Sequence, residues 1–221
     1  MPTATPEPID PDLPGWLEPV PRTLPDCGGV RLHLLADDYP RGPLPGAGPQ
    51  VSIAAPPYWA FCWASGLALA RHLLRHPEWV AGRSVLDFGC GSAVVGIAAA
   101  RAGAARVIVC DQDSRARAAA LRNAALNGVE VEATHAVPFE RNPLPFELML
   151  ASDVCYEEDN LTLLQHAASL GIAVLAADSR LDGRLPTGFQ RLGTVHARTI
   201  PDLDEAEHFN RITLFSSCSP S

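Results

Sequence analysis

One continuous stretch of the sequence, Ser84 to Ala100 (SVLDFGCGSAVVGIAAA), constrains the fold more than any other. Its first five residues are mostly apolar, as in a buried strand, and the segment 89–93 that follows contains two glycines. Small apolar residues then continue from Val94 without a proline, which is typical of a buried helix. The stretch therefore predicts a strand, a tight turn and a helix, the repeating unit of an open α/β sheet.

Strand-like and helix-like segments keep alternating after this stretch. Strands are expected at residues 106–113, 129–136, 146–154 and 172–178, and helices at 114–128 and 159–170. Two further strand candidates, 192–200 and 210–217, lie at the C-terminus and fit an antiparallel hairpin. The pattern predicts an α/β fold with a doubly wound, mostly parallel sheet and an antiparallel C-terminal edge hairpin.

The N-terminal part differs in composition, because about half of the chain's 21 prolines fall in the first fifty residues. We expect an irregular arm over residues 1–26, a short strand within 30–35 and a loop at 40–49. Apolar residues at helical spacing between Leu67 and Leu74 then predict a helix that ends at His76–Pro77. We divide the chain into a proline-rich N-terminal arm (1–50) and one α/β domain (51–221).

Bulk composition argues against several classes of protein. The net charge of −8 disfavours a general grip on the phosphate backbone of nucleic acid. There is no apolar run of the ~18 residues that a spanning helix needs and no pattern of a secretory signal, so we expect a cytoplasmic protein that binds neither nucleic acid nor membrane. The six cysteines are scattered without a C-x-x-C pair or a Cys/His cluster, so we expect reduced thiols and no metal site.

The glycine turn fits a cofactor other than a dinucleotide. A G-x-G-x-x-G pattern would need glycine where the sequence has Val94, and Asp87 before the turn would repel a pyrophosphate but attract a cation. S-adenosylmethionine (SAM) carries a sulfonium and an ammonium group, which suits Asp87. Asp111, at the end of the next strand, is placed to accept both ribose hydroxyls. A nicotinamide cofactor and an unliganded turn remain alternatives, because Asp111 would serve an NAD site equally well.

The segments VLDFGCGSA and VIVCDQD together resemble motifs I and II of the class I, seven-strand SAM-dependent methyltransferases, with Ala93 in place of the third glycine. The resemblance implies a Rossmann-like seven-strand sheet, SAM as the cofactor and a methyltransferase domain over residues 51–221. It also implies a set of cofactor-binding residues: Trp63, Asp87, Gly89, Cys90, Gly91, Asp111, Gln112 and Ser152.

Two further segments resemble protein-lysine methyltransferases. The sequence DVCY at 153–156 matches their D-x-x-Y/F pattern, and it lacks the prolines typical of enzymes that act on planar amide or base nitrogens. The block PPYWAFCWASGLALARHLL resembles the electron-transfer-flavoprotein β-subunit lysine methyltransferases and their bacterial homologues. The resemblance implies methylation of a lysine on a protein substrate, such as a flavoprotein or a ribosomal protein. The roles that it implies are catalytic for Asp153 and Tyr156, and substrate-binding for Tyr58 and Trp59.

The sequence also departs from that family. His135 stands where many class I enzymes place an acid or amide near the adenine amine, and Phe139 is a candidate to stack on adenine. After the fifth strand, the Asp-Pro-Gly-Arg of the relatives becomes Asp178-Ser179-Arg180 followed by an insertion-like segment. This departure leaves the identity of the protein target open.

We expect Asp153 to recruit and orient the lysine ammonium, Tyr156 to pack against it and the proton to leave through water. Cys90 and Cys155 lack a matched histidine, so we expect them to pack rather than to act as nucleophiles. The alternative functions are a small-molecule N-methyltransferase of the nicotinamide type and a non-catalytic, methyltransferase-like binding protein. The chain contains no lysine and therefore cannot methylate itself on a lysine side chain.

Overall fold

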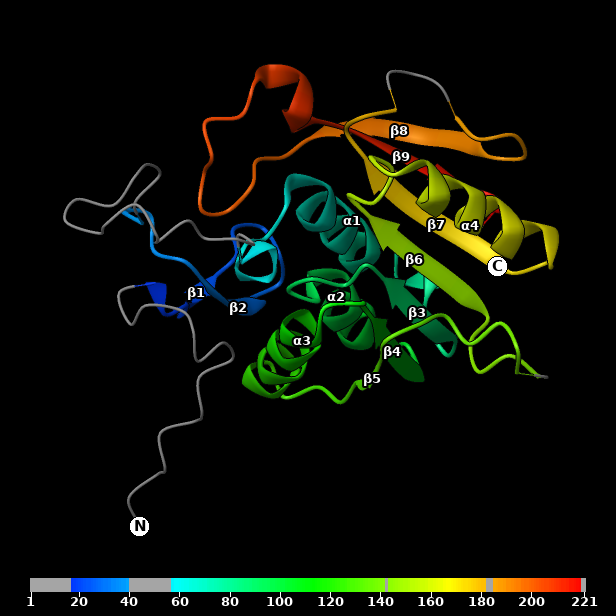
Figure 1. The fold of residues 1–221 in the computed structure, drawn as a ribbon, viewed down its shortest axis with the longest axis horizontal. Helices are drawn as coiled ribbons and strands as arrows, with labels where there is room; N and C mark the ends of the chain where they lie inside the picture. Colours follow the sequence, from blue (N-terminus) through cyan, green and yellow to red (C-terminus); the bar gives the residue numbers. More distant parts are fainter. Residues whose placement is uncertain (1–16, 40–56, 142, 182–184, 220–221) are drawn as a thin grey trace, which may run out of the picture.

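The computed structural model describes residues 17–39, 57–141, 143–181 and 185–219. At its centre lies a seven-strand sheet in the order β5-β4-β3-β6-β7-β9-β8 (Figure 1). The strands from β5 to β7 are parallel, β9 is antiparallel to β7, and β8 is antiparallel to β9. Their bounds are β3 Ser84–Phe88, β4 Arg106–Cys110, β5 Glu132–Thr134, β6 Leu148–Ser152, β7 Ala173–Asp178, β8 Gln190–His196 and β9 Arg211–Ser216. The predicted α/β class, parallel sheet and C-terminal hairpin are confirmed.

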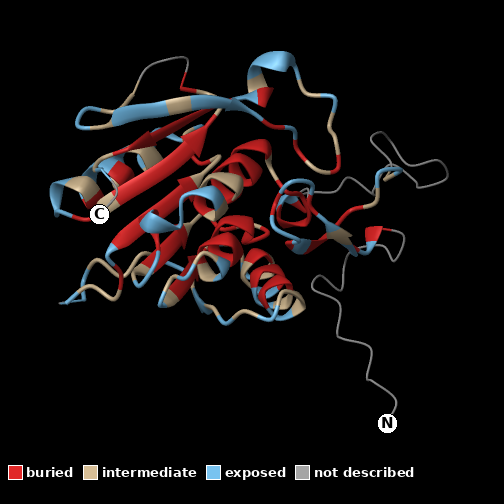
Figure 2. Cartoon of the chain, turned by 180° about the vertical axis from the view of Figure 1, so that it is seen from behind, coloured by how far each residue is buried: buried red, intermediate tan, exposed pale blue. Residues whose placement is uncertain are grey.

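Helices pack on both faces of this sheet, as a doubly wound fold requires. Helices α1 (Ala64–Arg75), α2 (Val94–Arg101) and α3 (Ser114–Leu126) share one apolar cluster with the strands, and α4 (Glu158–Ser169) belongs to another. Neighbouring strand residues alternate between the two clusters, since Val85 belongs to the first and Leu86 to the second. Figure 2 shows the resulting buried strands and inner helix faces. The continuous apolar runs seen in the sequence are therefore strands that are covered on both sides.

The strand order creates a topological switch point at β3. Strand β3 pairs with β4 on one side and with β6 on the other, so the connections leave it in opposite directions. Because β3, β4, β6 and β7 are parallel, the loops that follow them lie at the same edge of the sheet.

Helix α2 can approach β3 and β4 closely because Gly96 has no side chain. A Cβ there would lie 3.1 Å from both the Asp87 carboxylate and Val109.

The N-terminal region contains a strand that the sequence analysis did not predict. Val20–Thr23 forms β1, which pairs antiparallel with β2 (Arg31–Leu34), so the prediction of an irregular chain up to residue 26 is wrong here. Pro21 is compatible with this strand because a strand of a two-stranded sheet has an edge that needs no amide donor. The short strand β2 lies within the segment 30–35, where the alternation predicts one.

This two-stranded sheet is fixed to helix α3 by polar contacts. The Asn123 side chain accepts hydrogen bonds from the backbone and the ring Nδ1 of His33, at 2.8 and 3.0 Å, and donates one to the carbonyl of Ser92. The N-terminal strands are thereby connected to the turn after β3. Most of the N-terminal arm, and the loop expected at 40–49, lies outside the described residues. Among the helices of the described residues, none combines the length and the apolar character of a membrane-spanning segment.

Candidate active site

The turn between β3 and α2 is built from residues with positive φ. Gly89, Gly91 and Ala93 have φ values of 66, 47 and 60°, a region in which side chains are strained and glycine is not. A Cβ on Gly89 would lie 2.6 Å from Cγ1 of Val154, whereas a Cβ on Gly91 would meet no atom within 4 Å. Gly89 therefore allows contact with the loop after β6, and Gly91 leaves open space beside the turn.

Asp87 is buried under this turn. Its side chain is 1% exposed, and its Oδ2 accepts a hydrogen bond from the Gly96 amide at 2.8 Å. Burial raises the pKa of Asp87 to about 8, against the lowering effect of the Gly96 hydrogen bond, and the negative charge of Asp111 adds to the rise. A buried carboxyl group with this pKa is prepared to ionise when a cation arrives beside it.

Asp111 binds both the turn at residues 89–93, which we call the cofactor turn, and the start of α3. Its Oδ2 accepts from the Gly91 amide and its Oδ1 from the Asp113 amide, each at 3.0 Å. Each carboxylate oxygen keeps one further lone pair, so the group retains the capacity to accept a pair of ribose hydroxyls. The next residue, Gln112, is exposed, and its carbonyl accepts a hydrogen bond from Arg117.

The remaining predicted cofactor residues lie close to this turn or on the strand beside it. Cys90 is buried in the turn, and its amide donates to the carbonyl of Cys110 at 3.0 Å. Ser152 ends β6 and lies beside α1: its hydroxyl is 3.4 Å from the position that a Cβ on Gly66 would occupy. Trp63 immediately precedes α1 and is partly exposed.

The loop after β6 presents Asp153 to this region. Asp153 has a φ of 57°, and its amide donates to the carbonyl of Ala177 on β7 at 3.1 Å. Its Oδ1 lies 2.6 Å from Nη1 of Arg180, and the Asp153 side chain is 16% exposed. Burial raises the pKa of Asp153 to about 6, and the Arg180 charge acts in the opposite direction. Tyr156, by contrast, is exposed (61%) and contacts the Arg180 guanidinium through its ring.

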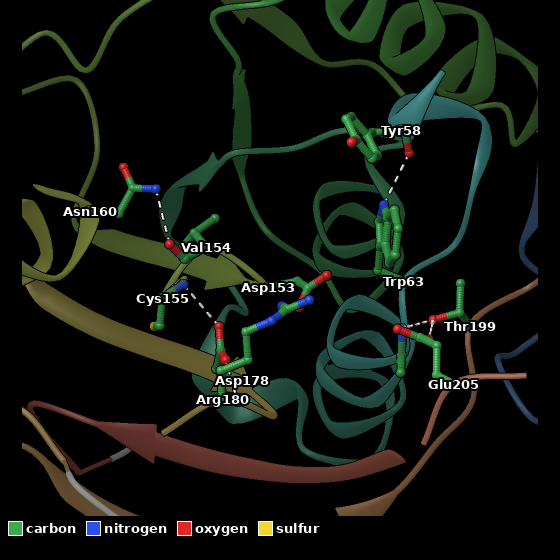
Figure 3. Close-up of polar contacts among 11 residues, drawn as sticks. Tyr58, Trp63, Asp153, Val154, Cys155, Asn160, Asp178, Arg180, Thr199 and Glu205 are labelled. Carbon is green, nitrogen blue, oxygen red and sulfur yellow. Dashed lines mark hydrogen bonds and ion pairs between the residues drawn. The ribbon is translucent and has the colours of Figure 1, made fainter. Parts of the chain in front are cut away.

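Asp178 joins the loops that follow β6 and β7, and sequence reasoning did not assign it a role in the site. This fully buried residue accepts from the Cys155 amide at 2.9 Å through Oδ2, and from the Arg180 amide at 2.7 Å through Oδ1 (Figure 3). Asp178 and Arg180 stand at the end of the strand next to β6, the position from which a side chain can reach Asp153. That position is the signal by which the sequence could have indicated them.

The aromatic residues before α1 divide into two groups. Tyr58 is 58% exposed, its carbonyl accepts from Trp63 Nε1 at 3.0 Å, and the two ring centroids are 6.0 Å apart. Figure 3 shows these two rings on the opposite side of Asp153 from Asp178. Trp59 is only 2% exposed and packs in an apolar cluster with Leu35 and residues of α3. The substrate-binding role of Trp59 stays a prediction: its ring packs in this cluster, and its buried Nε1 has no hydrogen-bond partner within the described residues.

A loop from the C-terminal hairpin also reaches the start of α1. Thr199 Oγ1 accepts from the Ala64 amide at 3.3 Å and donates to Glu205 at 2.6 Å. Glu205 is also one of the negative charges that raise the pKa of Asp153. Sequence reasoning missed Thr199 and Glu205, because they lie about fifty residues beyond Asp153 and share no recognisable motif.

The two residues considered for adenine recognition follow β5, whose last residue, Thr134, accepts a hydrogen bond from the Asp111 amide at 3.2 Å. His135 is exposed just after β5. Phe139 packs edge-on against His166 of α4, with ring centroids 5.2 Å apart. Neither observation identifies a group that recognises adenine.

The cysteines of the site have the properties of structural thiols. Burial raises the pKa of Cys90 and Cys155 well above the usual value, so neither forms a thiolate at neutral pH. All six cysteines of the chain are free thiols. The described residues contain no group of three or more His, Cys, Asp or Glu side chains able to hold a metal ion.

These features fit SAM. The open space beside Gly91 leaves room for a ligand, Asp111 offers hydrogen-bond acceptors for a ribose, and the buried Asp87 offers a carboxyl group for an ammonium. The arrangement places no basic side chain for a phosphate within this turn, whose residues 89–93 are Gly, Cys, Gly, Ser and Ala.

Comparison with known proteins agrees with the fold. The family model of ribosomal protein L11 methyltransferase (PrmA) matches residues 74–152, which include the cofactor turn and β6. The solved ribosomal protein L11 methylase of Lactobacillus delbrueckii subsp. bulgaricus superposes with a TM-score of 0.51 and 24% identity, over 67% of this chain and 76% of that chain. The chain therefore has the fold of the class I, SAM-dependent methyltransferases.

Among curated proteins, it resembles the electron transfer flavoprotein beta subunit lysine methyltransferases. The rat protein (Rattus norvegicus) is 36% identical over 116 residues, which cover 47% of this chain and 41% of the relative. The Xenopus laevis protein is 35% identical over 138 residues, 61% of this chain and 54% of the relative. The matched part thus spans about half the length of these relatives. The resemblance to this family expected from the sequence is confirmed.

Proposed function

We propose that this protein is a SAM-dependent methyltransferase that methylates a lysine side chain of a protein substrate. The observation that carries the proposal is a contact between the turn after β3 and the loop after β6, which we call the acceptor loop. Gly89 of the turn lies so close to Val154, the residue after Asp153, that there is no room for a Cβ. A methyl donor beside Gly91 and an acceptor beside Asp153 would therefore be neighbours. Methyl transfer depends mainly on such alignment of nucleophile, methyl group and sulfur.

The chain's own residues would divide the work as follows. When bound, SAM supplies a methyl group on a sulfonium, an already activated leaving group. Asp87 and Asp111 would hold the cofactor, and Asp153 would accept a hydrogen bond from the incoming amine and orient it. Tyr58 and Tyr156 are exposed, so both rings are available to contact a protein substrate.

The reaction requires an uncharged acceptor amine. A lysine with its ordinary pKa near 10.4 is protonated at pH 7, and presenting it uncharged costs about 4.6 kcal/mol. Removal of water by the rings of Tyr58, Trp63 and Tyr156 lowers this cost, whereas the negative charge of Asp153 taken alone raises it. The names of the relatives support a protein as the acceptor, namely the beta subunit of electron transfer flavoprotein or ribosomal protein L11.

The proposal is tested with the full chain and SAM labelled in its methyl group. Purified electron transfer flavoprotein β subunit, purified ribosomal protein L11 and a cell lysate that retains its small molecules serve as acceptors in parallel reactions. We expect label in a protein band that yields methyl-lysine on hydrolysis. Asp153→Ala should reduce the rate at least about 1000-fold while the SAM Kd changes less than about threefold, because the carboxylate acts only on the acceptor.

Three outcomes would contradict the proposal at different points. Absence of SAM binding at millimolar concentration would mean that the fold serves as a binding module. Label confined to the small-molecule fraction of the lysate would replace the protein acceptor with a metabolite. Near wild-type turnover of Asp153→Ala would remove Asp153 from the reaction.

A further inference from the structure

The acceptor carboxylate already has a cationic partner that belongs to the protein itself. Arg180 Nη1 lies 2.6 Å from Oδ1 of Asp153, and the two residues are 27 positions apart in the sequence. An incoming ammonium would be attracted to the same carboxylate. The role of Arg180 must therefore be compatible with the approach of a second cation.

Arg180 is fixed from several sides rather than extended into solvent. Its amide donates to the buried Asp178, and its side chain is 32% exposed. The guanidinium carbon lies 5.6 Å from the centroid of the Tyr156 ring and 5.3 Å from that of Phe209, both within the range of a cation–π contact. An arginine held in this way has a defined position relative to Asp153.

The ion pair uses one oxygen of the carboxylate and leaves the other. Within the described residues, Asp153 Oδ1 receives the Arg180 hydrogen bond, and no hydrogen bond or ion pair reaches Oδ2. In Figure 3 the carboxylate lies between the Arg180 guanidinium and Trp63. The acceptor can therefore approach Asp153 without displacing Arg180.

From this geometry we propose that Arg180 is the positioning residue of the acceptor site: it holds Asp153 by Oδ1, keeps that carboxylate ionised and cancels its charge toward an amine that binds at Oδ2. Three charged groups act on Asp153, namely Arg180 from the loop after β7, the buried Asp178 and Glu205 from the loop before β9. The two acids and the burial of Asp153 favour its protonated form, and Arg180 alone opposes them. The guanidinium thus supplies the charge that keeps Asp153 able to accept a hydrogen bond at neutral pH.

The same charge removes a conflict in the chemistry of the acceptor. A carboxylate without a counterion stabilises a lysine ammonium and raises its pKa, which slows the loss of the proton that methylation needs. Paired with Arg180, Asp153 can still orient the amine through a hydrogen bond while the pair as a whole carries no net charge. The surrounding rings can then lower the pKa of the amine by excluding water. This inference rests on the proposed function only in assuming that the acceptor is an amine.

The decisive measurement needs no acceptor. The full chain is labelled with [4-¹³C]aspartate, the Asp153 carboxyl resonance is identified by its absence from Asp153→Asn, and its titration is followed by NMR. We expect Arg180→Gln to raise the pKa of Asp153 by roughly one unit or more, and Arg180→Lys to recover most of the difference. Arg191→Gln is the matched control, because Arg191 lies on the exposed strand β8 and hydrogen-bonds to Thr194.

A second measurement connects this titration with transfer, using the electron transfer flavoprotein β subunit as the probe between pH 6.5 and 9.5. At pH 7, Arg180→Gln should be slower by about tenfold or more, and the loss should shrink toward pH 9.5 as the amine loses its proton without help. Arg180→Lys should restore the profile, and Arg191→Gln should leave it unchanged. Equal loss at every pH, or an unchanged pKa of Asp153 in Arg180→Gln, would overturn the proposal.

The two measurements separate this inference from the proposed function. If the electron transfer flavoprotein β subunit, ribosomal protein L11 and the lysate proteins all accept no methyl group, a lysine acceptor is excluded. The NMR titration still decides whether Arg180 sets the pKa of Asp153. If Arg180→Gln does not fold, shown by loss of its thermal unfolding transition, the titration of Arg180→Met decides, because methionine removes the charge and keeps an apolar chain beside the Tyr156 and Phe209 rings. A pKa of Asp153 within about 0.3 unit of wild type in Arg180→Met would then identify Arg180 as a purely structural residue.

Discussion

The turn after β3 and the loop after β6 touch each other, yet they hold their functional atoms by different means. In the turn, backbone amides and positive φ values at Gly89 and Gly91 define the shape, and the carboxylates of Asp87 and Asp111 are bound to amides. In the loop, Asp153 is positioned by the side chain of Arg180. The cofactor half depends on the course of the main chain, whereas the acceptor half adds the side-chain pair of Asp153 and Arg180 to its backbone hydrogen bonds.

This difference has a consequence for how the two halves can change. A side chain of the acceptor half can be exchanged without altering the backbone, so another acceptor can be accommodated on the same fold. A change in the glycine turn alters the backbone and therefore both halves. Substitutions that separate the two halves, or that fail to separate them, are the tests of this comparison.

The largest effect is expected from Gly89→Ala. The new methyl group combines a φ of 66° with a 2.6 Å approach to Val154, so the turn and the acceptor loop must both shift. We expect loss of about 2–4 kcal/mol in the free energy of unfolding, with SAM binding and methyl transfer both lost. Thermal unfolding and calorimetric titration with SAM measure these effects.

Two glycines provide matched controls for this variant. Gly171→Ala introduces a similar positive-φ strain (80°) where no atom lies within 4 Å, so it should cost stability by about 1 kcal/mol and leave SAM binding intact. Gly91→Ala should weaken SAM binding with little loss of stability beyond this strain, because its methyl group enters open space beside the turn. Equal effects of all three substitutions would mean that the contact with Val154 has no importance.

A smaller effect, confined to the acceptor half, is expected from Asp178→Asn. Asp178 uses both carboxylate oxygens to accept from the backbone amides of Cys155 and Arg180, whereas the asparagine side chain has only one oxygen. One of the two hydrogen bonds is therefore lost. We expect kcat to fall by about 10- to 100-fold, stability by about 1–3 kcal/mol and the SAM Kd to change less than threefold. The exposed Asp37→Asn, which removes only a surface ion pair with Arg22, should leave all three quantities unchanged. A large change in the SAM Kd of Asp178→Asn would show that the halves are not independent.

The same contrast explains what could be predicted from the sequence. The cofactor half was accessible because its determinants are local: two glycines after a strand, and acids at the ends of adjacent strands. The sheet followed from apolar runs and their alternation with helices. Strand β1 was missed because four residues that include Pro21 carry no strand pattern, and pairing with β2 alone makes them a strand.

The acceptor half was less accessible because its contacts connect distant segments. Asp153 and Tyr156 could be proposed from one short motif, but the contact of Asp153 with Arg180 and the effect of the Glu205 charge on its pKa depend on which loops meet at the sheet edge. Trp59 shows the same dependence on distant segments. A tryptophan in an aromatic cluster fits a core and a binding wall equally well, and its packing against α3 is visible only in the structure.

The smallest expected effect concerns Asp87 in the cofactor half, and it is seen as a pH dependence of stability. The pKa of Asp87 is raised to about 8 in the folded protein, against about 3.9 for an aspartate in an unfolded chain. Between these values the folded state binds one more proton than the unfolded state, so the contribution of Asp87 to stability is present at low pH and is lost as the pH rises through 8. Asp87→Asn removes this dependence. The variant should therefore gain stability relative to wild type at pH 8–9, and the gain should vanish below about pH 4.

Asp87→Asn should also reveal what the buried carboxyl group does for the cofactor. If the ammonium of SAM binds beside an ionised Asp87, binding at pH 7 must release the proton that Asp87 holds in the free protein. Calorimetric titrations in phosphate and in Tris, buffers with different enthalpies of protonation, should then report proton release for wild type and none for Asp87→Asn. We expect the SAM Kd of the variant to rise by about 10-fold. An unchanged Kd without any buffer dependence would mean that Asp87 only supports helix α2 through Gly96, and the cofactor half would then owe its affinity to the backbone and Asp111.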